Sequence, residues 1–202
     1  MQNRKDERIR REVDSLGIPS NEMLKKEIKR MDKKERYRKL IKGIISGLII
    51  ATAIILIITN VWLAVIQIDG TSMTPLLQMD EIVVATRTDN ATPNDIIAFT
   101  QKNKLYVKRV IAVAGDRIEI NNDGYVTVNG EMLDEPYVEE QSFGKTNIEF
   151  PYQVPTGTVF VMGDNRVSSV DSRDREFGPV SREQIVGKLV LKVWPLSKMG
   201  KM

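Results

Sequence analysis

Hydrophobic and polar positions divide this chain of 202 residues into three parts. Residues 1–42 are polar and highly charged, and residues 43–68 carry no charged side chain. The remainder alternates short apolar runs with turn residues. Long polar or apolar stretches without turn residues favour helix, whereas short runs between turns favour strands. The pattern therefore predicts a helical N-terminal part followed by an all-β domain.

The uncharged stretch 43–68 predicts one transmembrane helix. As a helix its 26 residues would span about 39 Å, against roughly 30 Å of hydrocarbon, so the stretch is longer than one upright span needs. Asn60 and Trp62 indicate an interfacial boundary, and residues 43–63 are assigned to the membrane. A cleaved signal peptide fits less well, because the apolar region exceeds about 15 residues and no small-x-small site follows it.

Charge is distributed asymmetrically about this stretch. Residues 1–42 hold 15 Lys+Arg and 8 Asp+Glu. The rest of the chain holds 15 Lys+Arg and 19 Asp+Glu. The positive-inside rule then places the N-terminus in the cytoplasm and the following domain outside the plasma membrane. Within the basic tail a helix is expected from near Glu22, either lying on anionic lipid or simply solvated. A membrane-tethered polyanion-binding role stays open, but no nucleic-acid-binding module accompanies the charge.

Beyond residue 63 the chain reads as antiparallel strands. Asp123 and Gly124 predict a hairpin turn, and Asn129 with Gly130 predicts the next one. Outside the first 60 residues, only residues 181–185 suggest a short helix. The predicted strands are β-branched runs at 65–68, 81–86, 95–99, 105–113, 117–120, 125–128, 157–162 and 185–193.

Composition narrows the possible chemistry. The chain contains no Cys and no His, which excludes a Cys nucleophile, a Ser-His-Asp triad and the usual structural zinc sites. A hydrolase of this composition needs Lys, Asp, Glu or Tyr as its base. A neutral Lys beside a Ser is a known arrangement of this kind. No cofactor or metal is predicted.

Ser72 is the candidate nucleophile. It lies in the segment 70–75, directly after the first predicted strand. Gly70 allows close backbone approach and Pro75 restricts φ, which together favour a tight bend that presents Ser72. Taken alone, the segment also fits an ordinary turn serine.

Lys108 is the candidate base. Strand alternation puts it on one face with Tyr106, Val110 and Ala112, while the opposite face carries mostly apolar side chains and Arg109. Two apolar faces predict a central strand and a poorly solvated Lys108, whose pKa burial would lower. The positive charge of Arg109 would act in the same direction if the two lie close together. An ion-paired or snorkelling Lys on an exposed face is the alternative.

A third segment, residues 163–173, is too polar for a strand and is rich in hydrogen-bonding side chains. It fits a surface loop held by turns and a local Asp171–Arg173 pair. It also fits a loop that supplies a hydroxyl and an ion pair to orient a buried base.

These three segments together resemble the type I signal peptidases, in particular the single-span Gram-positive form. Residues 70–75 match the family's serine box, residues 106–110 and 114–116 its lysine box, and residues 163–173 its glycine-aspartate box. The resemblance implies Ser72 as nucleophile and Lys108 as general base. It further implies Ser169 as hydrogen-bond partner of Lys108, with Asp171 and Arg173 bracing the site.

The resemblance also implies an oxyanion site at the Ser72 backbone N–H. Gly70 replaces a serine that some relatives use there, so only backbone or a neighbour such as Thr71 could help. The expected substrates are preproteins whose signal peptides end in small-x-small sites, bound as an extended strand. The protein is expected to act as a monomer in plasma-membrane lipid, with no nucleic-acid partner. A catalytically silent relative that assists assembly of surface proteins is the alternative.

The implied domain organisation has five parts. Residues 1–42 form the cytoplasmic tail and 43–63 the membrane helix. Residues 64–115 with 156–195 form the catalytic core, 116–155 a smaller β insertion, and 196–202 a C-terminal tail.

Overall fold

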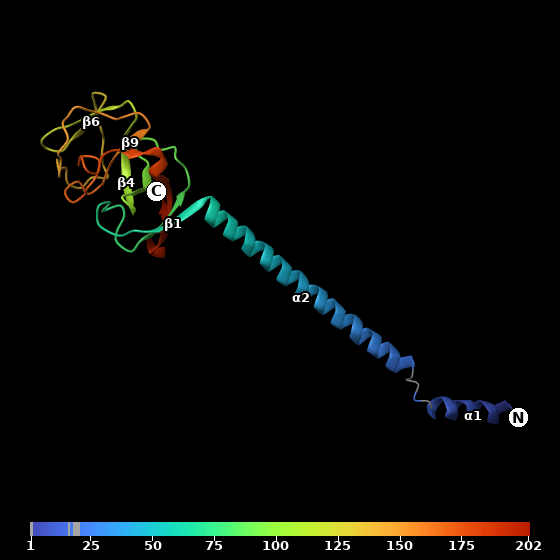
Figure 1. Cartoon of the computed structure of the whole chain (residues 1–202). Coiled ribbons are helices and arrows are strands. Elements are labelled where there is room, and N and C mark those ends of the chain that lie inside the picture. The colour runs from blue at the N-terminus through green and yellow to red at the C-terminus, as the bar shows by residue number, and fades with distance from the viewer. Residues whose placement is uncertain (1, 16, 18–20) are drawn as a thin grey trace. The chain divides into compact units, whose positions relative to one another are not determined.

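The computed structural model of the chain describes residues 2–15, 17 and 21–202, without the side chains of residues 2, 3, 10, 13, 14 and 58–60 (Figure 1). It divides into two compact units, Met1–Ile55 and Leu56–Met202. The first contains helix α1 (Gln2–Ser15) and most of helix α2 (Asn21–Val61). The second contains all the strands, so the fold is mostly antiparallel β-sheet preceded by an apolar helix.

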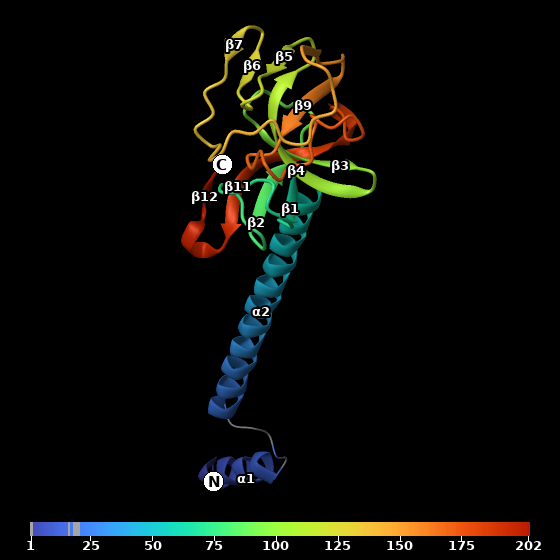
Figure 2. The ribbon, with the colours of Figure 1, turned by 90° about the vertical axis from the view of Figure 1, so that its left-hand side faces the viewer.

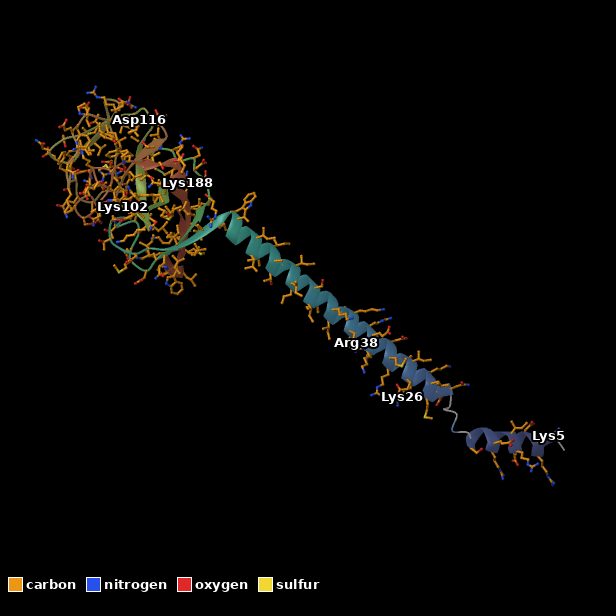
Figure 3. The ribbon with its side chains drawn as sticks, viewed as in Figure 1. Lys5, Lys26, Arg38, Lys102, Asp116 and Lys188 are labelled. Carbon is orange, nitrogen blue, oxygen red and sulfur yellow. The ribbon has the colours of Figure 1, made fainter. Side chains whose placement is uncertain are left out.

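Helix α2 is one continuous helix of 41 residues, whereas a basic helix and a separate membrane helix were expected. No proline interrupts residues 21–61, and Leu, Lys, Arg, Glu and Ile continue a helix readily. α2 includes a stretch long and apolar enough to cross a membrane. At its polar end the side chains of Lys26 and Arg38 extend away from the ribbon (Figure 3). The start near Glu22 is confirmed, and α1 was not predicted.

An eight-stranded antiparallel sheet dominates the second unit. Its strands run in the order β1-β2-β11-β3-β4-β9-β10, with β12 paired to β11. Every predicted strand of this sheet is present within a few residues of its expected bounds. The strands are β1 (Leu63–Gln67), β2 (Ile82–Thr86), β3 (Ile96–Gln101), β4 (Lys104–Val113), β9 (Thr158–Met162), β10 (Val180–Ser181), β11 (Ile185–Trp194) and β12 (Gly200–Lys201).

A smaller sheet has the order β7-β6-β5-β8, formed by β5 (Arg117–Ile120), β6 (Val126–Val128), β7 (Glu131–Met132) and β8 (Tyr152–Gln153). The predicted hairpin is confirmed, because Glu119 pairs with Thr127. Asn129 and Gly130, at φ 52° and 86°, make the next turn. Figure 2 shows β5, β6 and β7 grouped at one end of this unit, away from β1, β2 and β11.

We propose that residues 116–155 act as the insertion and residues 64–115 with 156–195 as the catalytic core. The short helix expected at 181–185 is the 3₁₀ turn η1 (Arg182–Gln184). The predicted tail 196–202 contains a second 3₁₀ turn, η2 (Leu196–Lys198), and strand β12.

Strand β4 lies between β3 and β9, as its two apolar faces predicted. The alternation along it is interrupted by a register shift between Val110 and Ala112. As a result Val113 packs in the same cluster as Tyr106 and Val110, although strict alternation placed it on the opposite face. A shift of one residue exchanges the faces beyond it.

Candidate active site

The segment that carries Ser72 is a tight turn between β1 and β2. The Thr71 carbonyl accepts hydrogen bonds from the Thr74 N–H at 3.2 Å and the Thr74 hydroxyl at 2.9 Å. The Leu77 N–H donates to the Met73 carbonyl at 2.8 Å, and both of these side chains are buried in the core. The turn is thus anchored on both sides of Ser72, which is itself only partly buried.

Gly70 has a different role from the one expected. A Cβ built on it would meet no atom within 4 Å, so close backbone approach is not the reason for glycine. Its φ of +110° is the reason, because L side chains rarely adopt that conformation.

Lys108 is buried, with 2% of its surface exposed, which rules out a lysine on an exposed strand face. Its Nζ lies 3.0 Å from the Ser169 hydroxyl, to which it donates. Burial lowers the pKa of Lys108 from 10.5 to about 8, with Asp171 and Asp164 opposing and Arg173 assisting the shift. A substantial fraction of this amine is therefore neutral at mildly alkaline pH.

Ser169, Asp171 and Arg173 form a buried chain that leads away from Lys108. Burial alone would raise the pKa of Asp171, but the hydrogen bonds and charge of Arg173, with smaller contributions from the Ser169 hydroxyl and the Gly163 N–H, bring that pKa below its ordinary value. The Arg173 guanidinium donates to both Asp171 oxygens, at 2.8 and 2.9 Å. Asp171 also accepts from the Gly163 N–H at 3.0 Å. The predicted local pair is present, but it is buried within the protein rather than on a surface loop.

The turn that carries Ser72 rests on this loop. The Ser72 carbonyl accepts from the Asn165 N–H at 3.1 Å, and the Asn165 side chain donates to Thr74 at 3.0 Å. A Cβ at Gly163 would lie closer than 3.0 Å to both the Ser72 carbonyl and the Ser169 side chain. Ser169 therefore has Lys108 on one side and the Ser72 main chain near the other.

Within the part of the chain that the structure describes, neither the Ser72 hydroxyl nor its N–H has a hydrogen-bond partner in the protein. Both groups are free to interact with a substrate. Lys108 is hydrogen-bonded to Ser169, and Asp171 is paired with Arg173 beside them. Ser72 meets this group through its carbonyl, in a turn that includes Gly70 and Thr71, and no hydrogen bond joins Ser72 to Lys108 within the described residues.

Arg109 does not act on Lys108 as expected. It forms a bidentate ion pair with Asp164, at 2.8 and 2.7 Å, so its charge is compensated locally. The cation that lowers the Lys108 pKa is Arg173 instead.

A third buried ion pair, Arg166–Glu135, was not predicted as part of the site. The two residues lie 31 positions apart, and neither side chain is exposed by more than 2%. Arg166 lies in the segment 163–173 that resembles the glycine-aspartate box, whereas Glu135 lies outside the three segments that carry the resemblance. A pocket of about 470 Å³ adjoins the site and is lined in part by Thr74, Asn165 and Ser168.

The sequence matches a known protein family and several of its members. Residues 41–194 match the family model described as signal peptidase, peptidase S26. The chain belongs to the signal peptidase family. It is 37% identical over 155 residues to signal peptidase I of Bacillus caldolyticus, covering 66% of this chain and 80% of that protein. It is 35% identical over 181 residues to signal peptidase IB of Staphylococcus aureus, covering 80% of this chain and 93% of that protein.

Signal peptidase I S of Bacillus subtilis (strain 168) is 34% identical over 167 residues, covering 77% of this chain and 90% of that protein. A crystal structure of signal peptidase I from Enterococcus faecalis V583 aligns at 29% identity with a TM-score of 0.42, covering 50% and 97% of the respective chains. The family is one of hydrolases, and its Gram-positive members are the relatives found here.

Proposed function

We propose that this member of the family cleaves signal peptides from exported preproteins at small-x-small sites, with Ser72 as nucleophile and Lys108 as general base. The observation that carries the proposal is the buried Lys108 amine, 3.0 Å from Ser169 in the loop that contacts the Ser72 turn. A serine hydroxyl is a weak nucleophile until a neighbouring base accepts its proton. Within the described residues, Lys108 is the buried lysine of this network.

In the first step the neutral Lys108 amine takes the Ser72 hydroxyl proton as Oγ bonds to the scissile carbonyl carbon. The oxyanion that forms accepts a hydrogen bond from the Ser72 N–H, a type of donor worth about 3–4 kcal/mol in other serine hydrolases. As the C–N bond breaks, the Lys108 ammonium returns the proton to the leaving amine. Water then hydrolyses the acyl-enzyme, with Lys108 again as base.

Ser169, Asp171 and Arg173 are positioning residues in this scheme. Ser169 holds the Lys108 amine, and Asp171 holds Ser169. Arg173 neutralises Asp171, which would otherwise favour the protonated, inactive form of Lys108.

We further propose that α2 anchors the protein in the plasma membrane with its basic end in the cytoplasm. The charge asymmetry across the apolar part of the helix supports this orientation. Protease added to intact spheroplasts should then digest residues beyond 70 and leave the tail. Protection of the β-rich unit would contradict the orientation.

The activity is tested by incubating the full detergent-solubilised chain with a preprotein and reading the cleavage site by mass spectrometry. Cleavage after a small-x-small motif is expected, and Ser72→Ala should abolish it. A catalytically silent assembly factor would cleave nothing. Because Lys108 must be neutral, kcat/KM should rise with pH through about 8. Turnover by Ser72→Ala equal to that of the unmodified chain would refute the proposed nucleophile.

A further inference from the structure

The segment 135–143, here called the strap, follows β7 and crosses to the loop that contains Ser169. It contacts three buried arginines, one in β4 and two in the loop that contains Ser169. The Arg109 guanidinium lies 3.8 Å from the centre of the Tyr137 ring. Arg166 pairs with Glu135, and Arg173 donates to the carbonyls of Ser142 and Phe143 at 3.0 and 3.2 Å.

The contact between Glu135 and Arg166 is the strongest of these by chemistry. The guanidinium donates to both carboxylate oxygens, at 3.1 and 2.5 Å. Paired donation of this kind fixes orientation as well as distance. The Tyr137 hydroxyl also donates to Glu135 at 3.1 Å. Both charges are out of contact with water, so each depends on the other for compensation.

Arg166 transmits this contact into the loop. Its Nε donates to the Gly163 carbonyl at 3.0 Å, and its own carbonyl accepts from Arg173 at 3.1 Å. Gly163 and Arg173 are the two residues that hold Asp171. A displacement of Arg166 would therefore shift both residues that hold Asp171. A shift of Asp171 would in turn displace Ser169 and Lys108.

We propose that the strap positions the base, and that Glu135 is the positioning residue that does so through Arg166. This role rests on the proposed function, since it concerns the geometry of the same Lys108. The strap contacts the arginines of the loop, and the apolar strands pack around Lys108. A base that moves by about 1 Å can lose around 10²-fold in rate even when substrate still binds.

The test is Glu135→Gln in the full chain, with Glu131→Gln as control. Glu131 is an exposed residue of β7 in the same small sheet. Glu135→Gln keeps the shape but removes the charge that Arg166 needs. We expect kcat to fall about 10- to 100-fold with KM nearly unchanged. Glu131→Gln should leave both unchanged. Glu135→Asp, which retains the carboxylate, should keep more of kcat than Glu135→Gln.

Two further readouts separate positioning from general destabilisation. A looser loop admits water to Lys108, which faces Asp171, Arg173 and Asp164. The rise of kcat/KM with pH should therefore move to higher pH in Glu135→Gln. Amide hydrogen exchange should increase in peptides that cover residues 163–173, while those from β3 and β4 stay protected.

The proposal is overturned if Glu135→Gln retains full kcat. It is also overturned if kcat falls while both the pH profile and the amide hydrogen exchange of residues 163–173 stay unchanged. If Glu135→Gln does not fold, Glu135→Asp carries the same three measurements, because its shorter side chain keeps the charge but cannot keep the bidentate contact with Arg166, so a smaller change of the same kind is expected and values equal to those of the unmodified chain overturn the proposal. Hydrogen exchange requires no turnover. Failure of the unmodified chain to cleave a preprotein would thus reject the proposed function, while the exchange result would separately decide whether the strap holds the loop.

Discussion

Strand β9 and the loop that follows it are both buried, yet by opposite chemistry. β9 (Thr158–Met162) contributes apolar side chains to two core clusters. The next residues bury carboxylates, guanidiniums and hydroxyls, at Asp164, Arg166, Ser169, Asp171, Ser172 and Arg173. Apolar burial is non-directional and depends mainly on volume. A buried charge network depends on every partner being in place.

Stability and catalysis therefore make different demands on neighbouring residues. The strand needs side chains of suitable size, whereas the loop needs particular atoms at particular distances. Substitutions that keep the approximate size of the side chain should therefore be mild in β9, where they stay apolar, and severe in the loop and around Lys108, where they remove a charge or a hydrogen bond.

The largest effect is expected for Lys108→Arg. A guanidinium stays protonated at any workable pH and cannot accept the Ser72 proton. Loss of a member of a catalytic pair typically costs about 10⁴-fold or more in kcat. The measurement is kcat/KM against pH for both proteins. Substantial turnover by Lys108→Arg at neutral pH would return Lys108 to a purely structural role.

Asp171→Asn tests the loop directly. It leaves Arg173 buried without its counter-charge, and breaking a buried pair in this way costs about 3–5 kcal/mol. The matched variant in β9 is Met162→Leu, which conserves volume and should cost less than about 1.5 kcal/mol. Denaturant unfolding of the two variants compares them. Equal destabilisation would mean that the two regions do not differ as described.

Lys108→Met should stabilise the folded protein at neutral pH while abolishing activity. The difference between 10.5 and about 8 in the Lys108 pKa corresponds to about 3 kcal/mol against folding when the amine is protonated. In the unmodified protein this penalty is fully present below pH 8. It diminishes as pH rises from about 8 towards 10.5, because the unfolded chain then binds more protons. Thermal unfolding at pH 7 and pH 10 should show the gap between the two proteins narrowing.

Ser169→Ala should have the smallest effect on activity of these changes. The base is still present but loses the hydroxyl that holds its Nζ at 3.0 Å. We expect kcat to fall about 10- to 100-fold with little change in KM. A single-turnover measurement on the solubilised chain would show this. Complete inactivity would imply that Ser169 takes part in the chemistry itself, and full activity would show that it does not hold the base.

Much of this organisation follows from local patterns. The β-branched runs predict the strands, and Asn129–Gly130 predicts its turn, because these signals depend on near neighbours. Two apolar faces were enough to predict a buried Lys108. The predicted basic helix and the predicted membrane helix form one continuous helix, α2, because no proline divides them and the change from charged to apolar residues does not by itself end a helix.

Patterns along the chain were sufficient to predict the element types, the apolar helix, the family and the candidate dyad. The pairing of buried charges, by contrast, depends on the folded arrangement of strands and loops. Arg109 pairs with Asp164, 55 residues away, and Arg166 with Glu135, 31 residues away. Side-chain pairs at such separations depend on how strands stack and where loops cross, which local propensity does not encode. The effect of Arg109 on Lys108 was expected only if the two charges lay close together, and local patterns reveal neither its Asp164 partner nor the contacts of the strap.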